Sequence, residues 1–202
     1  MKLLRFLMRL VIGGLFVGHG TQKLYGWFGG YGLEGTGQAF EGLGMRPGRR
    51  HAMAAGVAET AGGAAVAVGL ATPLATAALV GTMLTAINRV HLKAGPWASD
   101  GGYEYNLVLI FALLALTESG PGKPSLDAAL GLEKSGTGWA LAAAGAGVAG
   151  AVGAHLIAEA APASAESEPS PTASAAPAPD SAAPEAVVPT PESPVPTPPT
   201  GP

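Results

Sequence analysis

Five apolar runs separated by short polar loops constrain this chain more than any other feature of its sequence. We predict helices over Leu3–Tyr25, His51–Leu70, Leu74–His91, Tyr103–Thr117 and Trp139–Ile157. A helix that crosses the hydrocarbon core of a bilayer needs about 20 mostly apolar residues, and four of the runs approach or exceed that length. Charged residues make up 12% of the chain, about half of the share that is usual in soluble domains. The pattern predicts an all-α membrane helical bundle, with the lipid bilayer as its first partner.

Composition divides the chain into three parts. Residues 1–132 hold four of the runs and are predicted to form a four-helix transmembrane core. Residues 133–161 hold the fifth run, which is nearly all Ala, Gly and Val, and are predicted to form a fifth transmembrane helix. Residues 162–202 contain 13 of the 18 prolines, together with Ala, Ser, Thr and Glu. Because this last part lacks the apolar side chains that would offset its ordering entropy, we predict a disordered tail.

Local signals refine this picture between and within the runs. Residues 36–43 are predicted to form a short amphipathic turn, and Ser125 can cap a short surface helix that begins at Leu126. Small residues recur in the first two runs, and spacings such as that between Gly14 and Gly18 let two helix backbones approach closely. They are Gly14 and Gly18 in the first run and Gly56, Gly62 and Gly63 in the second. These signals favour a compact bundle.

Several functional classes are excluded by what the sequence contains. Without cysteine, the chain has no structural disulfide, thiolate metal site or dithiol relay of its own. Its Lys and Arg residues are scattered, which argues against binding nucleic acid. Its four dispersed histidines do not suggest a metal or haem site. The pattern Gly30-x-Gly32-x-x-Gly35 resembles a dinucleotide fingerprint but follows an apolar helix where the fingerprint needs a strand, so we interpret it as an interfacial loop.

Polar side chains interrupt the apolar runs close to one end of each predicted helix. Ionisable groups at membrane depth are costly and usually face the interior of a bundle or a cavity. Because successive helices alternate in direction, the first and third runs end at the face where the second and fourth begin. The side chains expected to meet there are His19, Lys23, Glu59, Asn88, Arg89, Glu104 and Asn106.

Two interpretations of this cluster stay open. In one, Lys23 and Arg89 offset Glu59 and Glu104 in a buried ion-pair network that only fixes helix register. In the other, the same side chains line a cavity for a quinone head group, a proton or a small polar substrate, with Glu59 as acid and base. The aromatic residues near this face are expected to form a structured cap over the cluster: Tyr25, Trp27, Tyr31, Trp97, Tyr103 and Tyr105. His51 and His155 are interpreted as isolated interfacial side chains.

The distribution of basic residues favours one orientation in the membrane. Lys and Arg gather on the cytoplasmic side of membrane proteins. With Lys23 and Arg89 counted as bundle residues, a cytoplasmic N-terminus gives five basic residues inside and four outside. Five spans then place the Pro-rich tail on the external side.

Four segments resemble the successive motifs of the DoxX family of small bacterial integral membrane proteins. They read RLVIGGLFVGHGTQKLYGWFGG, GVAETAGGAAVAVGLATPLATAAL, GGYEYNLVLIFALLAL and GPGKPSLDAALGL, and together they cover about Arg9 to Leu132. The resemblance implies a four-helix core in the bacterial inner membrane. It also implies a redox association, because the family is similar to the DoxD-type subunits of thiosulfate:quinone oxidoreductase. The family pattern falls on His19, Lys23, Glu59 and Glu104.

Two functional hypotheses follow from the residues and the resemblance together, ahead of a third, a proton or small-solute channel, for which five short spans with one polar end outline no continuous path. The first is a membrane subunit of an oxidoreductase, in a redox, quinone-linked or oxidative-stress system with a soluble redox enzyme as partner and a quinone as the implied cofactor. The second is a non-enzymatic membrane scaffold that recruits a soluble partner through residues 27–50 or through the tail.

Overall fold

The computed structural model describes residues 2–161, and within them the secondary structure is helical, with no β-strand. The α-helices are α1 (Lys2–Tyr25), α2 (Gly32–Gly42), α3 (Gly48–Val68), α4 (Thr72–Ala86), α5 (Glu104–Ser119), α6 (Leu126–Leu130) and α7 (Thr137–Ala160). A π-helical turn, Ile87–His91, continues α4, and three short 3-10 turns cover Trp27–Gly29, Leu92–Ala94 and Ala98–Asp100. The predicted all-α bundle is confirmed. The predicted disorder of the tail concerns residues 162–202, which lie outside the described residues.

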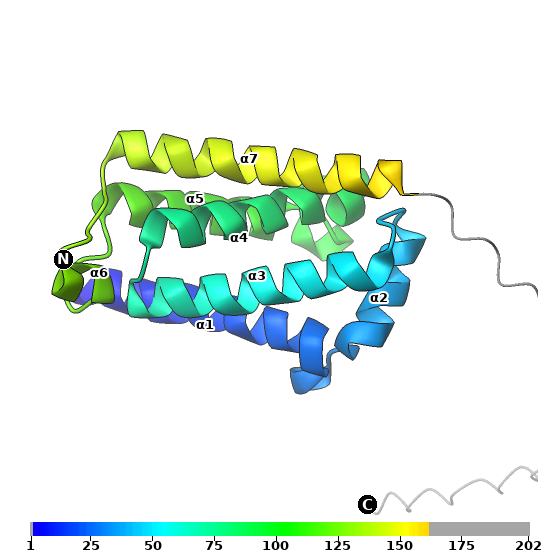
Figure 1. Ribbon diagram of the computed structural model, residues 1–202, viewed down its shortest axis with the longest axis horizontal. Helices are drawn as coiled ribbons and strands as arrows, with labels where there is room; N and C mark the ends of the chain where they lie inside the picture. Colours follow the sequence, from blue (N-terminus) through cyan, green and yellow to red (C-terminus); the bar gives the residue numbers. More distant parts are fainter. Residues whose placement is uncertain (1, 162–202) are drawn as a thin grey trace, which may run out of the picture. The chain divides into compact units, whose positions relative to one another are not determined.

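Five long helices lie side by side and correspond to the five predicted runs (Figure 1). α3 packs against both α1 and α4, and α7 packs against both α4 and α5. Helix α2 lies at one end of the bundle and α6 at the other (Figure 1). Within residues 2–161, two segments are long and apolar enough to cross a membrane, by length and composition: Leu3–Tyr25 in α1 and Thr137–Ala160 in α7.

The short helices also form where the sequence places them. α2 extends the turn predicted over residues 36–43 by four residues toward the N-terminus, starting at Gly32. The hydroxyl of Ser125 accepts a hydrogen bond from the backbone N–H of Ala128 at 3.2 Å, which is the predicted cap of α6.

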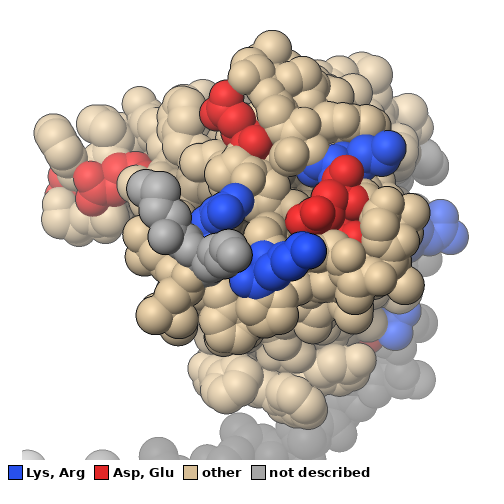
Figure 2. Space-filling view, turned by 90° about the vertical axis from the view of Figure 1, so that its left-hand side faces the viewer, with Lys and Arg blue, Asp and Glu red and all other residues tan. Residues whose placement is uncertain are grey.

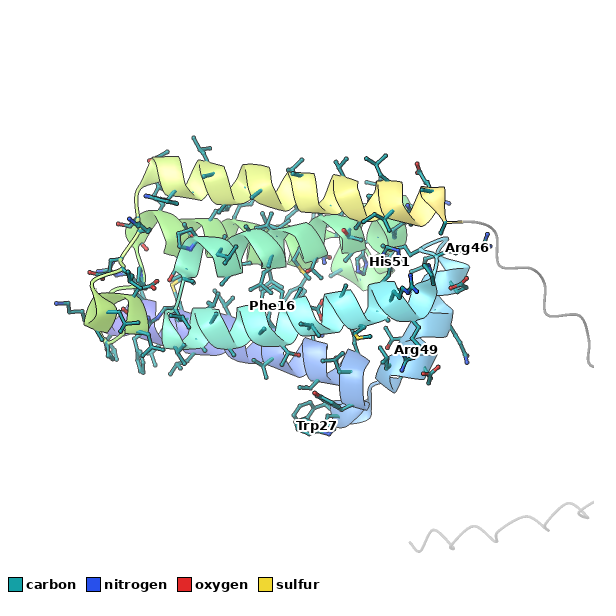
Figure 3. The ribbon with its side chains drawn as sticks, in the orientation of Figure 1. Phe16, Trp27, Arg46, Arg49 and His51 are labelled. Atoms are coloured by element: carbon teal, nitrogen blue, oxygen red, sulfur yellow. The ribbon has the colours of Figure 1, made fainter. Side chains whose placement is uncertain are left out.

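The core lies where α1, α3, α4 and α5 meet. Phe16 projects from α1 into the middle of the bundle (Figure 3) and is 1% exposed. It belongs to one cluster of buried apolar side chains with Val66 of α3, Leu79 of α4 and Leu113 of α5. These contacts hold the long helices side by side, in alternating directions, and so determine which side chains meet at each end of the bundle.

Close packing of α1 on α3 uses Gly56 and Gly63 of the small residues expected within the runs, but not Gly14 or Gly18. A Cβ atom on Gly13 would lie 2.4 Å from the carbonyl oxygen of Gly63, and one on Gly20 would lie 2.2 Å from the hydroxyl of Thr60. Gly14 and Gly18 have open space around their Cβ positions. The expectation for these two residues was therefore wrong, because their side of α1 faces away from α3.

The end of the bundle that carries α6 contains a polar network enclosed by protein, in which Nε and Nη1 of Arg9 have no hydrogen-bond partner among the described residues. Asp127 is 1% exposed, and its carboxylate accepts hydrogen bonds from the backbone N–H groups of Ala71 and Thr72 at 2.8 and 3.1 Å. The hydroxyl of Thr72 donates a third bond at 2.8 Å. Arg9, also 1% exposed, donates to the carbonyl of Pro124 and interacts electrostatically with Asp127. The surface at this end shows basic and acidic side chains close together (Figure 2).

Candidate functional site

A buried ion pair joins α1 to α3 at the end of the bundle opposite α6. The ammonium Nζ of Lys23 lies 2.6 Å from Oε2 of Glu59. The side chain of Glu59 is 2% exposed, whereas that of Lys23 is 24% exposed. The contact arises because α1 ends where α3 begins and because glycines bring the two backbones together. The structure therefore brings together two members of the expected cluster, Lys23 and Glu59.

His19 lies on the same face of α1, one helical turn before Lys23. Its ring nitrogen Nδ1 is 3.1 Å from the side-chain oxygen of Gln22, and its backbone carbonyl accepts a hydrogen bond from Lys23 Nζ at 3.4 Å. Lys23 is thus held by an acid on one side and by its own helix on the other. This arrangement fixes the ammonium where it neutralises Glu59.

Arg89 belongs to the π-helical turn that continues α4. Such turns are rare and are frequently found at functional sites. The Nε of Arg89 donates to Nδ1 of His155 in α7 at 2.8 Å, and Nη1 lies 3.5 Å from the carbonyl oxygen of Leu43. Asn88 of the same turn is exposed on the surface and does not join the cluster. Its predicted place in the site was wrong because it precedes Arg89 by one residue and so points to another side of the helix.

Glu104 has a different partner from the one expected. Its Oε1 accepts a hydrogen bond at 2.8 Å from the backbone N–H of Ala98, so it holds the loop that precedes α5. Among the described residues, Arg89 forms no ion pair with an acid. Of the expected offset of Glu59 and Glu104 by Lys23 and Arg89, the described residues therefore form the Lys23–Glu59 pair alone.

Asn106 lies in the first turn of α5 and is buried, and only one of its hydrogen-bonding groups has a partner. It is 6% exposed, and its Nδ2 donates to the sulfur of Met83 at 3.4 Å. Within residues 2–161, the amide has no other hydrogen bond. Buried amides in proteins normally satisfy most of their hydrogen-bonding groups, so this side chain has spare capacity for a donor and an acceptor.

These side chains surround an open cavity of about 910 Å³. A cavity of this size is in the range of small-molecule sites, which combine apolar walls with a few polar groups. Most of the lining is apolar, from α3, α4 and α7. Five of the seven expected residues line it, namely His19, Lys23, Glu59, Arg89 and Asn106.

Comparison with known proteins identifies the family. The family model described as DoxX matches residues 4–92. The protein named "Putative oxidoreductase CatD" of Bacillus subtilis (strain 168) is 35% identical over 113 residues, which cover 56% of this chain and 78% of that protein. This chain belongs to the DoxX family. The family and the two apolar helices together make it a membrane protein. No solved structure matches the chain at a significant level.

The aromatic residues of this DoxX protein do not cap the cavity. Trp27 points away from the bundle (Figure 3) and is 57% exposed, and Tyr31 is 84% exposed. Of the six aromatic residues expected to form a cap, Tyr105 is the one that lines the cavity. Phe40, which was not among the six, and Leu43 border the cavity instead. The expected cap was wrong because the loop after α1 turns outward, with Phe28 in a left-handed backbone conformation (φ 53°).

Two histidines interpreted as isolated belong to the site of this DoxX protein. His155 accepts the hydrogen bond from Arg89, and His51 lines the cavity near Arg46 (Figure 3), whose carbonyl lies 3.2 Å from its Nε2. His91, at the end of the π-helical turn, also lines the cavity. The signal for His155 was available, because a fifth alternating helix ends at the same face as the first and third.

Proposed function

We propose that this DoxX protein is a membrane subunit of a quinone-linked redox or oxidative-stress system, and that its cavity takes the quinone head group. The observation that carries the proposal is the buried Lys23–Glu59 ion pair, which lines a cavity that is otherwise mainly apolar. A charge pair of this kind is expensive to bury, and acids and bases with perturbed surroundings concentrate at functional sites. A relative that carries the word oxidoreductase in its name supports a redox role.

The proposal includes a multi-pass arrangement in the bacterial cell membrane. The five long helices, α1, α3, α4, α5 and α7, would each cross the bilayer, with the N-terminus in the cytoplasm and the tail outside. The alternating directions of these helices support this arrangement, as does the apolar surface of α1 and α7. The cavity then lies near the external face, where a soluble redox enzyme could reach it.

The residues present fit a quinone head group. Its ring is flat and apolar and carries two carbonyl oxygens, which match the apolar walls and the donors Lys23, Arg89 and Asn106. When bound, the quinone supplies the redox chemistry, accepting two electrons from the soluble partner and two protons. Glu59, a carboxylate in the resting ion pair, would relay the two protons one at a time, taking each from water in the open cavity and passing it to the ring. Lys23 then stabilises the carboxylate that remains, at 2.6 Å.

The experiment is a Glu59→Gln substitution, which keeps the shape of the side chain and removes its proton exchange. We expect the variant to fold and insert, and quinone-dependent activity in native membranes to fall by about a hundredfold or more, the usual contribution of a positioned acid and base. The matched control is Glu34→Gln, because Glu34 also pairs with a basic residue, Arg49, at 2.7 Å but is 75% exposed. Full activity of Glu59→Gln would contradict the proposal.

A scaffold function is the second candidate, and the exposed aromatic loop favours it. Trp27, Phe28 and Tyr31 are 57%, 76% and 84% exposed. A non-enzymatic scaffold would recruit a soluble partner through residues 27–50 or through the tail. Under this alternative, Glu59→Gln is silent, and replacing the three aromatic residues by serine abolishes capture of the partner from native membranes.

A further inference from the structure

Arg89 lines the cavity from the turn that follows α4 and is held there by two neutral groups. Its Nε donates to Nδ1 of His155 in α7 at 2.8 Å, and its Nη1 lies 3.5 Å from the carbonyl oxygen of Leu43, just after α2. An arginine has five N–H donors, and these contacts use two of them, which leaves three. The contacts therefore fix the guanidinium beside the cavity without neutralising it.

The charges that line the cavity do not balance. Lys23 and Arg89 are the basic side chains of the lining, and Glu59 is the one acid among the described residues that line it. Lys23 lies 2.6 Å from Glu59, whereas Arg89 forms no ion pair within residues 2–161. The lining also holds three histidines, which are either neutral or positive and so cannot offset Arg89. They are His19, His51 and His91.

The other acids near Arg89 do not neutralise it either. Glu104 accepts a hydrogen bond from the backbone of the loop before α5 and does not line the cavity. Glu159 follows His155 by one turn of α7 and interacts with it electrostatically, but it is exposed and also lies outside the lining. A positive charge beside mainly apolar walls is costly without a counter-charge, and a bound anion would remove that cost.

We infer that the cavity holds an oxyanion, a phosphate or a carboxylate group, at Arg89. The planar fork of a guanidinium matches the paired oxygens of these groups. The cavity, at about 910 Å³, lies at the upper end of the range of roughly 300–1,000 Å³ for small-molecule sites, so space remains beside a quinone ring. The inference goes beyond the proposed function and needs no quinone, since Lys23 and Asn106 remain as donors to the ring.

Three substitutions separate the charge of Arg89 from its contacts. Arg89→Gln removes the charge. Arg50→Gln is the matched control, because Arg50 lies in the first turn of α3 at the same end of the bundle, is exposed and does not line the cavity. Arg89→Lys keeps the charge but loses the fork that reaches both His155 and Leu43.

The probes are two anions, each with a counterpart that has no net charge. Phosphatidylglycerol is compared with phosphatidylcholine of the same acyl chains, and glycerol phosphate is compared with glycerol. The first pair supplies the phosphate on a lipid and the second supplies it free in solution. The measurement is the Kd of each probe for the full chain in an uncharged detergent, from the rise of the unfolding temperature with probe concentration.

We expect at least one anion to bind the wild type about tenfold or more tightly than its uncharged counterpart, a reading that needs no variant. Arg89→Gln should weaken that Kd about tenfold or more, while Arg50→Gln leaves it within about twofold and Arg89→Lys keeps more of the affinity than Arg89→Gln. Preference for phosphatidylglycerol identifies a lipid as the source of the anion, and preference for glycerol phosphate identifies a soluble ligand.

Three results overturn the inference. Neither anion binds more tightly than its counterpart, Arg89→Gln and Arg50→Gln bind alike, or Arg89→Lys weakens binding as much as Arg89→Gln, which would mean that the contacts of Arg89 matter and its charge does not. Failure of the proposed function is a separate result. In that case menadione, a quinone without a long chain, does not bind and Glu59→Gln has no effect on activity, whatever the outcome at Arg89.

Discussion

The two ends of this bundle each bury an acid next to a base, but in different surroundings, since Arg9 is buried and Lys23 is partly exposed. At the α6 end, Asp127 accepts three hydrogen bonds from Ala71 and Thr72, and Arg9 packs directly against Gly69. At the other end, Glu59 has Lys23 as its partner and lines a cavity of about 910 Å³. Neither Arg9 nor Asp127 lines that cavity. The first network is closed by protein, and the second is left open on one side.

This difference separates a structural role from a functional one. A buried charge alone does not identify a ligand site, because buried charges also occur in networks that only hold helix ends in place. Asp127 caps the first turn of α4, where its negative charge also meets the positive end of the helix dipole. The Lys23–Glu59 pair caps no helix. Its position beside an open cavity is what the structural role does not explain.

The largest loss in the free energy of unfolding is expected from Asp127→Ala. The change removes three hydrogen bonds and leaves Arg9 buried without its acid, and breaking a buried charge network of this kind costs about 3–5 kcal/mol. The free energy of unfolding, measured by denaturant titration in detergent micelles, should fall by that amount. The affinity of the remaining folded protein for menadione should stay unchanged, because the network is closed to the cavity.

Asp100→Ala is the control for this prediction. Asp100 is exposed, and its side chain makes no hydrogen bond within the described part of the chain. Surface substitutions of this type change stability by no more than about 0.5 kcal/mol. An Asp127→Ala variant as stable as Asp100→Ala would show that the closed network does not hold the bundle together.

A smaller loss in the free energy of unfolding is expected from Gly13→Ala. The change displaces α1, which carries Arg9 at one end of the bundle and Lys23 at the other. The new Cβ would lie 2.4 Å from the carbonyl of Gly63, so the two backbones must move apart. Overpacking of this kind costs about 1–3 kcal/mol. Gly14→Ala is the matched control, since its Cβ has open space and alanine favours a helix by about 1 kcal/mol. Equal unfolding free energies for the two variants would rule out close packing of α1 on α3.

Much of the fold could be predicted because apolar runs and turn residues are local signals. The five runs, the short helix near residues 36–43 and the Ser125 cap all depend on neighbours in the sequence. The direction in which a side chain points around a helix was harder to predict. Gly14 was expected at the contact that Gly13 makes, and Asn88 at the cavity that Arg89 lines, each an error of one residue, or about 100° around a helix.

For the site, the face of the bundle could be predicted but not the pairings. Alternating helix directions place Lys23, Glu59 and Arg89 at one end, and the structure has them there. Which acid meets which base depends on distances between helices that no local pattern encodes. Glu104 binds a backbone N–H in the adjacent loop, and Arg89 binds His155 of a helix outside the recognised motifs. The sequence indicated that two bases balance two acids at this end, and within the described residues packing joins Lys23 with Glu59.

The smallest effect on stability is expected from the double substitution Lys23→Met with Glu59→Leu. Replacing a buried ion pair by apolar side chains of similar volume is often neutral, so we expect the free energy of unfolding to stay within about 1 kcal/mol of the wild type. Lys23→Met alone leaves Glu59, which is 2% exposed, without a partner and should cost up to about 3 kcal/mol. Menadione binding should be lost in the double variant although it folds. A double variant as unstable as the single one would instead mean that this pair holds the bundle together in the way that Asp127 does, and the two ends would then not differ in role.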